Sequence, residues 1–223
     1  MKHLEEDLQR LKSNMVDMSN LVISQIQKGI TALINNDKAM AREVIFNEKR
    51  VNAYELRIDK DCENIITLQN PMAHDMRFVF ATFKINSNME RIGDNAEGIA
   101  KYAVDVEKDL DTALIEKTRL REMTDTVKLM ISNAAEAYLN NDGNLARTIF
   151  NQDTILNEIN GQATGIIADY VKNNPENIIQ ALYLLSIIRK LERVGDHITN
   201  IAEEVIFYVE AKVLKHGKKD MES

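Results

Sequence analysis

Two short acidic motifs of almost the same sequence carry the residue types best able to do chemistry in this chain. The first is Glu90-Arg-Ile-Gly-Asp94 and the second is Glu192-Arg-Val-Gly-Asp196. Helical residues four positions apart project within about 40° of each other, so each motif places two carboxylates on one helix face. Like charges at this spacing repel by roughly a few tenths of a kcal/mol. A bound cation would reverse the sign of that interaction, so the motifs indicate a metal site.

A glycine stands at the same place in both motifs. Glycine inside a helix costs about 1 kcal/mol relative to alanine, and here the cost is met twice at the same offset. The absence of a side chain must therefore serve a purpose. Close approach of a neighbouring helix is the simplest one.

A second segment in each half of the chain offers further oxygen ligands. Glu48, Asn52, Glu55 and Asp59 fall within about 60° of each other on a helix. The equivalent face in the second half carries Asp153, Asn157 and Asn160. Ligand sets made only of oxygen suit hard or borderline cations, and we expect Fe, Mn, Zn or Mg. The candidate metal ligands are Glu48, Asn52, Glu55, Glu90, Asp94, Glu97, Asp153, Asn157, Glu192, Asp196 and Glu203.

Composition narrows the fold and the location. With 8 Gly and 2 Pro in 223 residues, the chain lacks the turn signals of an all-β fold, and long helices are expected. The longest apolar run, Ala181 to Ile188, falls far short of the roughly 18 residues of a membrane span. A single cysteine excludes a disulfide framework and no signal peptide pattern opens the chain, so we expect a cytoplasmic protein. The net charge of −7 without a basic stripe argues against nucleic-acid binding.

An internal repeat predicts the architecture. Residues 32–42 match residues 137–147 at an offset of 105 (137 − 32), and the acidic motifs match at 102 (192 − 90). Such self-similarity is typical of repeated structural units. We expect an all-α fold of two tandem, similar three-helix bundles, over residues 1–109 and 112–214, with a charged tail over 215–223. In the first unit, the expected helices end near Asn35, near Gln69 and, beginning at His74 after Pro71, near Val106.

At these motifs the chain resembles the PhoU family of phosphate-signalling proteins. The resemblance covers nearly the whole chain, and it is carried by both acidic motifs, by the continuation of the second to Glu203, and by the segments Glu48 to Asn52 and Asp153 to Asn157. It implies two three-helix bundles and acidic motifs that hold multinuclear metal clusters. It also implies a cytoplasmic accessory protein that negatively regulates the phosphate-starvation response. The implied partners are the phosphate ABC transporter, especially its ATPase, and the membrane histidine kinase, and we expect a homodimer.

The chain departs from the family pattern at its neutral ligands. Asn52 and Asn157 stand where the family motifs usually end in Asp, which replaces an anionic ligand by a neutral carbonyl. We therefore expect weaker or smaller clusters. Asn160 replaces the counterpart of Glu55, so the second site is expected to be the poorer one, with Glu203 as partial compensation.

Three alternative functions compete with a metal-binding regulator. A di-iron enzyme would need a Glu-x-x-His motif, and the sequence has none. It also lacks a Gly-rich phosphate loop, a nucleophile elbow and a Cys–His pairing. We therefore expect no catalysis. A helical adaptor without bound metal would use the acidic stripes to dock proteins. Metal storage would require many more ligands. His197 and Cys62 are minor candidates for ligation, and an isolated cysteine is more often a small buried hydrophobe.

Overall fold

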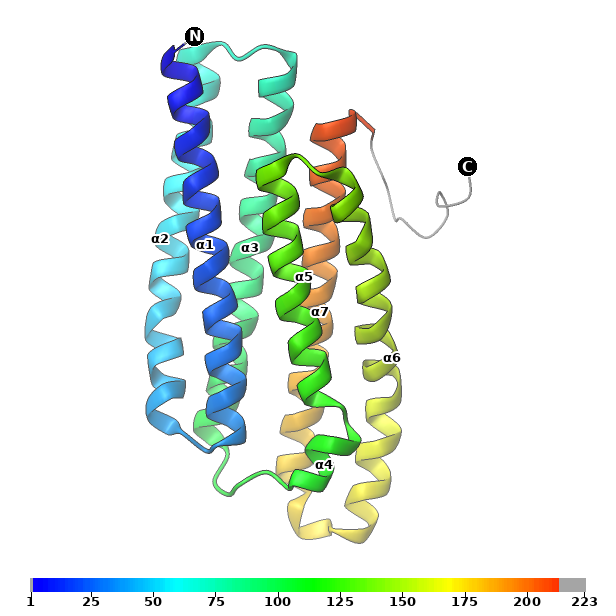
Figure 1. Cartoon of the computed structure of the whole chain (residues 1–223). Helices are drawn as coiled ribbons and strands as arrows, with labels where there is room; N and C mark the ends of the chain where they lie inside the picture. Colours follow the sequence, from blue (N-terminus) through cyan, green and yellow to red (C-terminus); the bar gives the residue numbers. More distant parts are fainter. Residues whose placement is uncertain (1, 213–223) are drawn as a thin grey trace.

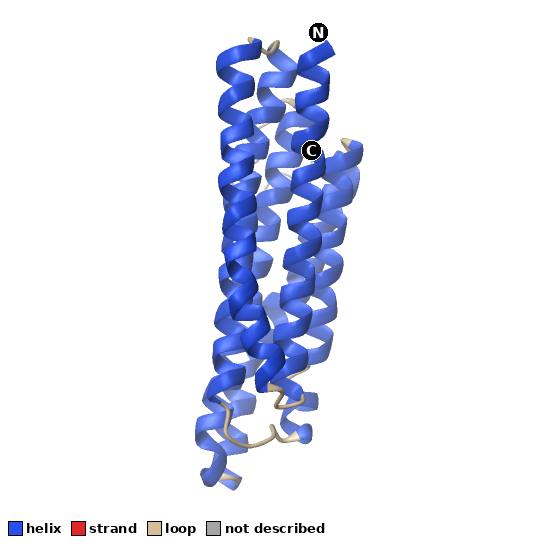
Figure 2. Cartoon of the chain, turned by 90° about the vertical axis from the view of Figure 1, so that its left-hand side faces the viewer, coloured by secondary structure: helices blue, strands red, loops and turns tan. Residues whose placement is uncertain are grey.

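In the computed structural model of the chain, residues 2–212 are described, and these form helices and connecting segments only (Figure 2). Six long helices and two short ones follow one another: α1 (Lys2–Ile34), α2 (Lys38–Gln69), α3 (Ala73–Asp105), α4 (Thr112–Lys117), α5 (Leu120–Asn140), α6 (Gly143–Asn173), the 3-10 helix η1 (Pro175–Asn177) and α7 (Ile178–Glu210). The expected all-α fold is confirmed. Over the described range, none of these helices has the length and apolar character needed to cross a membrane.

The long helices form two three-helix bundles side by side (Figure 1). Helices α1, α2 and α3 pack pairwise in the first, and α5, α6 and α7 pack pairwise in the second. The expected tandem arrangement is therefore confirmed. The segment over residues 106–111 and the short α4 join the two bundles. Independent folding of units 1–109 and 112–214 stays a prediction, and the tail 215–223 lies outside the described residues.

The same three-residue turn opens the second helix of each bundle. Asn36 and Asn141 adopt the left-handed backbone region, with φ of 50° and 54°, which asparagine tolerates better than most residues. The next residues, Asp37 and Asp142, accept hydrogen bonds from backbone N–H groups in the first turns of α2 and α6. These are N-caps, and they explain why the repeat at residues 32–42 and 137–147 was visible in the sequence. The expected helix ends in the first unit fall within one residue of those observed.

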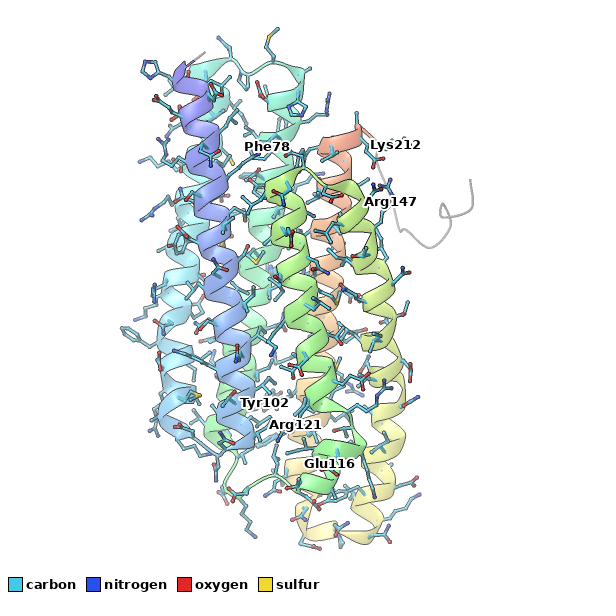
Figure 3. All side chains as sticks on the ribbon, in the orientation of Figure 1. Phe78, Tyr102, Glu116, Arg121, Arg147 and Lys212 are labelled. Carbon is cyan, nitrogen blue, oxygen red and sulfur yellow. The ribbon has the colours of Figure 1, made fainter. Side chains whose placement is uncertain are left out.

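Aromatic residues hold the two bundles together at both ends of the α3–α7 contact. The Phe78 ring lies 5.4 Å from the ring centroids of both Tyr138 and Tyr208. Farther along α3, Tyr102 lies 5.2 Å from Tyr183. Figure 3 shows Phe78 and Tyr102 toward opposite ends of α3. Because the buried residues of both bundles belong to one hydrophobic cluster, the two halves share a core.

Truncation of Phe78 should destabilise the whole chain. Phe78 is 4% exposed and lies between rings of the other bundle, so Phe78→Ala should cost about 3–5 kcal/mol of unfolding free energy through lost burial and a cavity. Phe80, on the same helix but 51% exposed, is the matched control, and Phe80→Ala should cost about 0.5 kcal/mol or less. Urea unfolding followed by circular dichroism gives both values. Equal losses would contradict a shared aromatic core.

Candidate metal centre

The antiparallel packing of α2 on α3 brings the candidate ligands of the first bundle onto facing surfaces. The carboxylate of Glu48 interacts electrostatically with Glu97 and Asp94, and that of Glu90 interacts with Glu55 and Asp94. Asp94 thus interacts with both Glu48 and Glu90 and lies between them. We call this group the first acidic cluster: Glu48, Asn52, Glu55, Glu90, Asp94 and Glu97.

The motif glycines permit this packing. A Cβ atom on Gly93 would lie 2.8 Å from Val51 Cγ1, and one on Gly195 would lie 2.5 Å from Leu156 Cδ1. Real Cβ atoms essentially never approach other atoms so closely, so a side chain at either position would require the facing side chain or its helix to shift. The expected role of the glycines in close helix packing is confirmed for both bundles.

The first acidic cluster is crowded with negative charge. The pKa values of Glu48, Glu55 and Glu90 are all raised, first by partial burial and then by neighbouring carboxylates. Two cations flank the cluster. Lys101 Nζ lies 2.6 Å from Glu97 Oε2, and Arg91 Nη1 lies 3.8 Å from Asp94 Oδ2. These cations reduce the repulsion without removing it, since the pKa values remain raised.

Two asparagines complete the polar surface between α2 and α3. The buried Oδ1 of Asn52 accepts no hydrogen bond within residues 2–212, so a neutral oxygen ligand is available at the centre of the cluster. Asn86 was missed by the sequence reasoning. Its Nδ2 donates to the backbone oxygen of Glu55 at 2.9 Å and to Asp59 Oδ1 at 2.8 Å. Its position one turn before Glu90 on the same face is the signal that could have found it.

The second bundle carries a smaller cluster. Burial raises the pKa of Glu192, and the carboxylates of Asp196 and Asp153 raise it further. Asn157 Nδ2 donates to Asp153 Oδ2 at 2.6 Å, so this amide holds a carboxylate. The cluster thus has three carboxylates where the first has five (Glu48, Glu55, Glu90, Asp94 and Glu97), and the half-buried Asn160 of α6 adds no charge.

Three further candidates lie apart from the acidic pairs. Glu203 follows Glu192 by about three turns, or about 16 Å along α7 at 1.5 Å per residue, so the two cannot share one ion. His197 Nδ1 lies 3.1 Å from Asn88 Oδ1 on α3, and burial lowers the pKa of His197. Cys62 is buried, and burial raises its pKa to about 12. The expectation that Cys62 is a buried hydrophobe is confirmed.

Across residues 2–212, no three Asp, Glu, His or Cys side chains lie close enough together to hold a metal ion. The candidate ligands therefore lie on facing helices without forming a closed coordination site. What fits a hard cation is the donor chemistry: carboxylates whose charge is poorly compensated, beside the unpaired amide oxygen of Asn52.

The comparison with protein families settles the relationship of the whole chain. The family model described as PhoU domain matches twice, over residues 15–103 and 120–205. The chain belongs to the PhoU family. The two matches cover the bulk of α1–α3 and nearly all of α5–α7, so each bundle corresponds to one PhoU domain.

Named relatives and solved structures agree with this assignment. The "Phosphate-specific transport system accessory protein PhoU homolog" of Borreliella burgdorferi is 34% identical over 210 residues, which is 92% of this chain and 94% of that protein. The crystal structure of PhoU from Pseudomonas aeruginosa matches with a TM-score of 0.84 at 28% identity, over 93% of this chain and 99% of that one. The "phosphate transport system regulatory protein PhoU from Streptococcus pneumoniae" matches with a TM-score of 0.86 at 25% identity, over 95% and 99%.

Charge crowding in the first acidic cluster makes stability depend on pH. A carboxyl whose folded pKa is raised binds its proton more tightly when folded, so stability falls as the pH rises from the unfolded value of about 4.3 through the raised value. In chelator at pH 7, Glu90→Gln should therefore stabilise the protein. We expect the unfolding free energy to rise by less than about 1 kcal/mol, because the cluster is partly exposed and screened. Such a gain raises the melting temperature by at most about 2–4 °C.

The gain should vanish near pH 3, well below the unfolded pKa of about 4.3, where the carboxyl is almost fully protonated in both states. Glu63→Gln, at an exposed position of α2, is the matched control and should change little at either pH. Thermal melts at the two pH values measure both variants. A Glu90→Gln protein less stable than wild type at pH 7 would show that Arg91 compensates the carboxylate fully.

Proposed function

We propose that this PhoU protein is an accessory regulator of phosphate-specific transport. It acts in the cytoplasm, reports the state of the phosphate ABC transporter to a membrane histidine kinase, and keeps the phosphate-starvation response off when phosphate is plentiful. The single observation that carries the proposal is the family match in both bundles. Relatives whose names describe transport accessory proteins support it. The contacts with the transporter ATPase and with the kinase come from the family resemblance. A homodimer stays a prediction on the same ground.

We propose further that the first acidic cluster holds a divalent metal or iron ion. The support is physical. Carboxylates from α2 and α3 face one another at partly buried positions, and the pKa values of three of them are raised by burial and by one another. A cation here would require Glu48, Glu90 and Asp94, with the carbonyl oxygen of Asn52, to move closer together around it, since no three of these side chains converge by themselves. Its charge would offset the repulsion between the carboxylates at the helix junction. The smaller cluster of the second bundle would bind more weakly.

A helical adaptor without metal is the second candidate. Two observations favour it: Lys101 and Arg91 already lie against the carboxylates, and no three candidate ligands converge within residues 2–212. In that case the acidic surface would serve to dock a basic partner. Metal content separates the two candidates.

Deletion of the gene should leave the starvation response switched on in phosphate-replete cells, because the state of the transporter would no longer reach the kinase. Expression of starvation genes measures this, and re-expression of the wild-type chain should restore repression. Unchanged expression in the deletion strain would remove the regulator function.

Metal binding should stabilise the protein, and chelation should reverse the effect. At free metal 100 times the dissociation constant, the gain is about 2.7 kcal/mol, or about 5–10 °C in melting temperature. The double variant Glu90→Gln, Asp94→Asn should bind less metal and lose most of this response. The matched control removes two carboxylates at the exposed positions Asp17 and Glu63 and should respond like wild type.

Elemental analysis and thermal melts make the measurement. Protein purified without chelator is compared with protein incubated with Fe²⁺, Mn²⁺, Zn²⁺ or Mg²⁺. If the wild-type chain takes up none of these metals and melts identically with and without chelator, the metal site is rejected. The helical adaptor without metal is then the function that is kept.

A further inference from the structure

A cleft of about 620 Å³ lies between α3 and α7, where the two bundles meet. Four cationic side chains line it: Arg91 and Lys101 from α3, and Lys190 and Arg193 from α7. Arg91 and Arg193 occupy the same position in the two copies of the acidic motif. The acidic residues of each motif interact within their own bundle, but the arginines of both motifs line this one cleft.

The cleft is locally cationic in a chain of net charge −7. Its four cations face three carboxylates, those of Asp94, Glu97 and Asp105. Lys101 is paired with Glu97 at 2.6 Å. Arg91 lies 3.6 Å from Glu90 Oε2 and 3.8 Å from Asp94 Oδ2, within ion-pair range of both but beyond hydrogen-bond distance. Among the ion pairs of residues 2–212, none joins Lys190 or Arg193 to a carboxylate, although Arg193 interacts electrostatically with the neighbouring Glu192. Two guanidinium groups and one ammonium therefore retain donors for an anion.

Helix packing holds these groups at the cleft. Lys190 crosses from α7 onto α3 at Gly98, where a Cβ atom would lie 2.6 Å from Lys190 Nζ. The glycine thus leaves the space that the ammonium group uses. On the same stretch, His197 contacts Asn88 of α3. This contact joins α7 to α3 beside the cleft.

We infer that the cleft binds a phosphate-class oxyanion, either orthophosphate or a phosphate monoester, through Arg91, Lys190 and Arg193. Guanidinium groups match phosphate oxygens with paired, charge-assisted hydrogen bonds, and lysine adds a point charge. The inference goes beyond the proposed function and does not require the metal. A ligand here contacts both bundles at once, which couples its binding to the α3–α7 interface.

Isothermal titration calorimetry of the full chain tests the inference. The titrations use orthophosphate and, separately, adenosine monophosphate, at constant ionic strength and with chelator present so that no metal contributes. We expect saturable binding of at least one probe with a Kd below about 1 mM. Arg91→Gln, Lys190→Gln and Arg193→Gln should each weaken it about tenfold or more, since each removes a charged hydrogen-bond donor.

Two further variants separate a site from a general charge effect. Arg189→Gln removes the same charge from an exposed position on α7 outside the cleft, and it should bind like wild type. Gly98→Ala keeps every charge but displaces Lys190, so it should weaken binding. Circular dichroism confirms that each variant remains helical.

Each outcome decides the inference. Binding of orthophosphate assigns the free ion, and binding of the nucleotide alone assigns a phosphate monoester. Absence of saturable binding by both probes overturns the inference. Equal weakening by Arg189→Gln, or binding that is insensitive to the three cleft variants, also overturns it.

Discussion

The close packing of α2 on α3 brings five carboxylates together, and their repulsion is the constraint to which the rest of the site responds. Apolar burial on the same helices opposes it, because Val51, Ile92 and Ala96 are almost completely buried. Gly93 reduces the helix separation until the carboxylates are partly desolvated. Partial desolvation strengthens both repulsion and attraction, so the cluster is sensitive to any cation that approaches. Within the chain, Lys101 and Arg91 partly neutralise the carboxylates. A metal ion or a basic partner would neutralise them further.

The two bundles share one architecture but carry different numbers of carboxylates at the equivalent helix contact. The second bundle keeps the motif glycine and the acidic pair, but Asn160 on α6 stands where α2 has Glu55, and Thr199 on α7 stands where α3 has Glu97. In both bundles the equivalent asparagine hydrogen-bonds a carboxylate, Asn52 to Glu48 and Asn157 to Asp153, so the difference between the bundles lies in the number of carboxylates. A repeat of one architecture thus presents a strongly acidic surface on one side and a mildly acidic surface on the other. A partner or an ion can distinguish the two halves on charge alone.

Local sequence was sufficient to predict the elements and the acidic faces. The Asn-Asn-Asp turns specify where α2 and α6 begin, because the left-handed backbone and the cap depend on those residues alone. Spacing along one helix also placed Glu90 and Asp94 on a single face. Spacing could not predict which helices of the other bundle the remaining faces of α3 meet. The stacking of Phe78 on Tyr138 and Tyr208, and the convergence of Arg91 with Arg193, join residues more than fifty positions apart, and they depend on how α7 runs antiparallel to α3.

The α3–α7 contact is apolar at its ends and polar in its middle. Aromatic rings pack at Phe78 and at Tyr102. Between them lie Lys84 paired with Glu204 at 2.9 Å, the Asn88–His197 contact, and the cationic cleft. Apolar packing holds the helices in register, because displacement of a buried ring opens a cavity. Charged groups on the partly exposed side of this contact, such as Lys84 and Glu204, can exchange partners at little cost, because screened ion pairs contribute at most about 1 kcal/mol. The middle of this contact is therefore the place where a bound charge can change the fit between the two bundles without unfolding either.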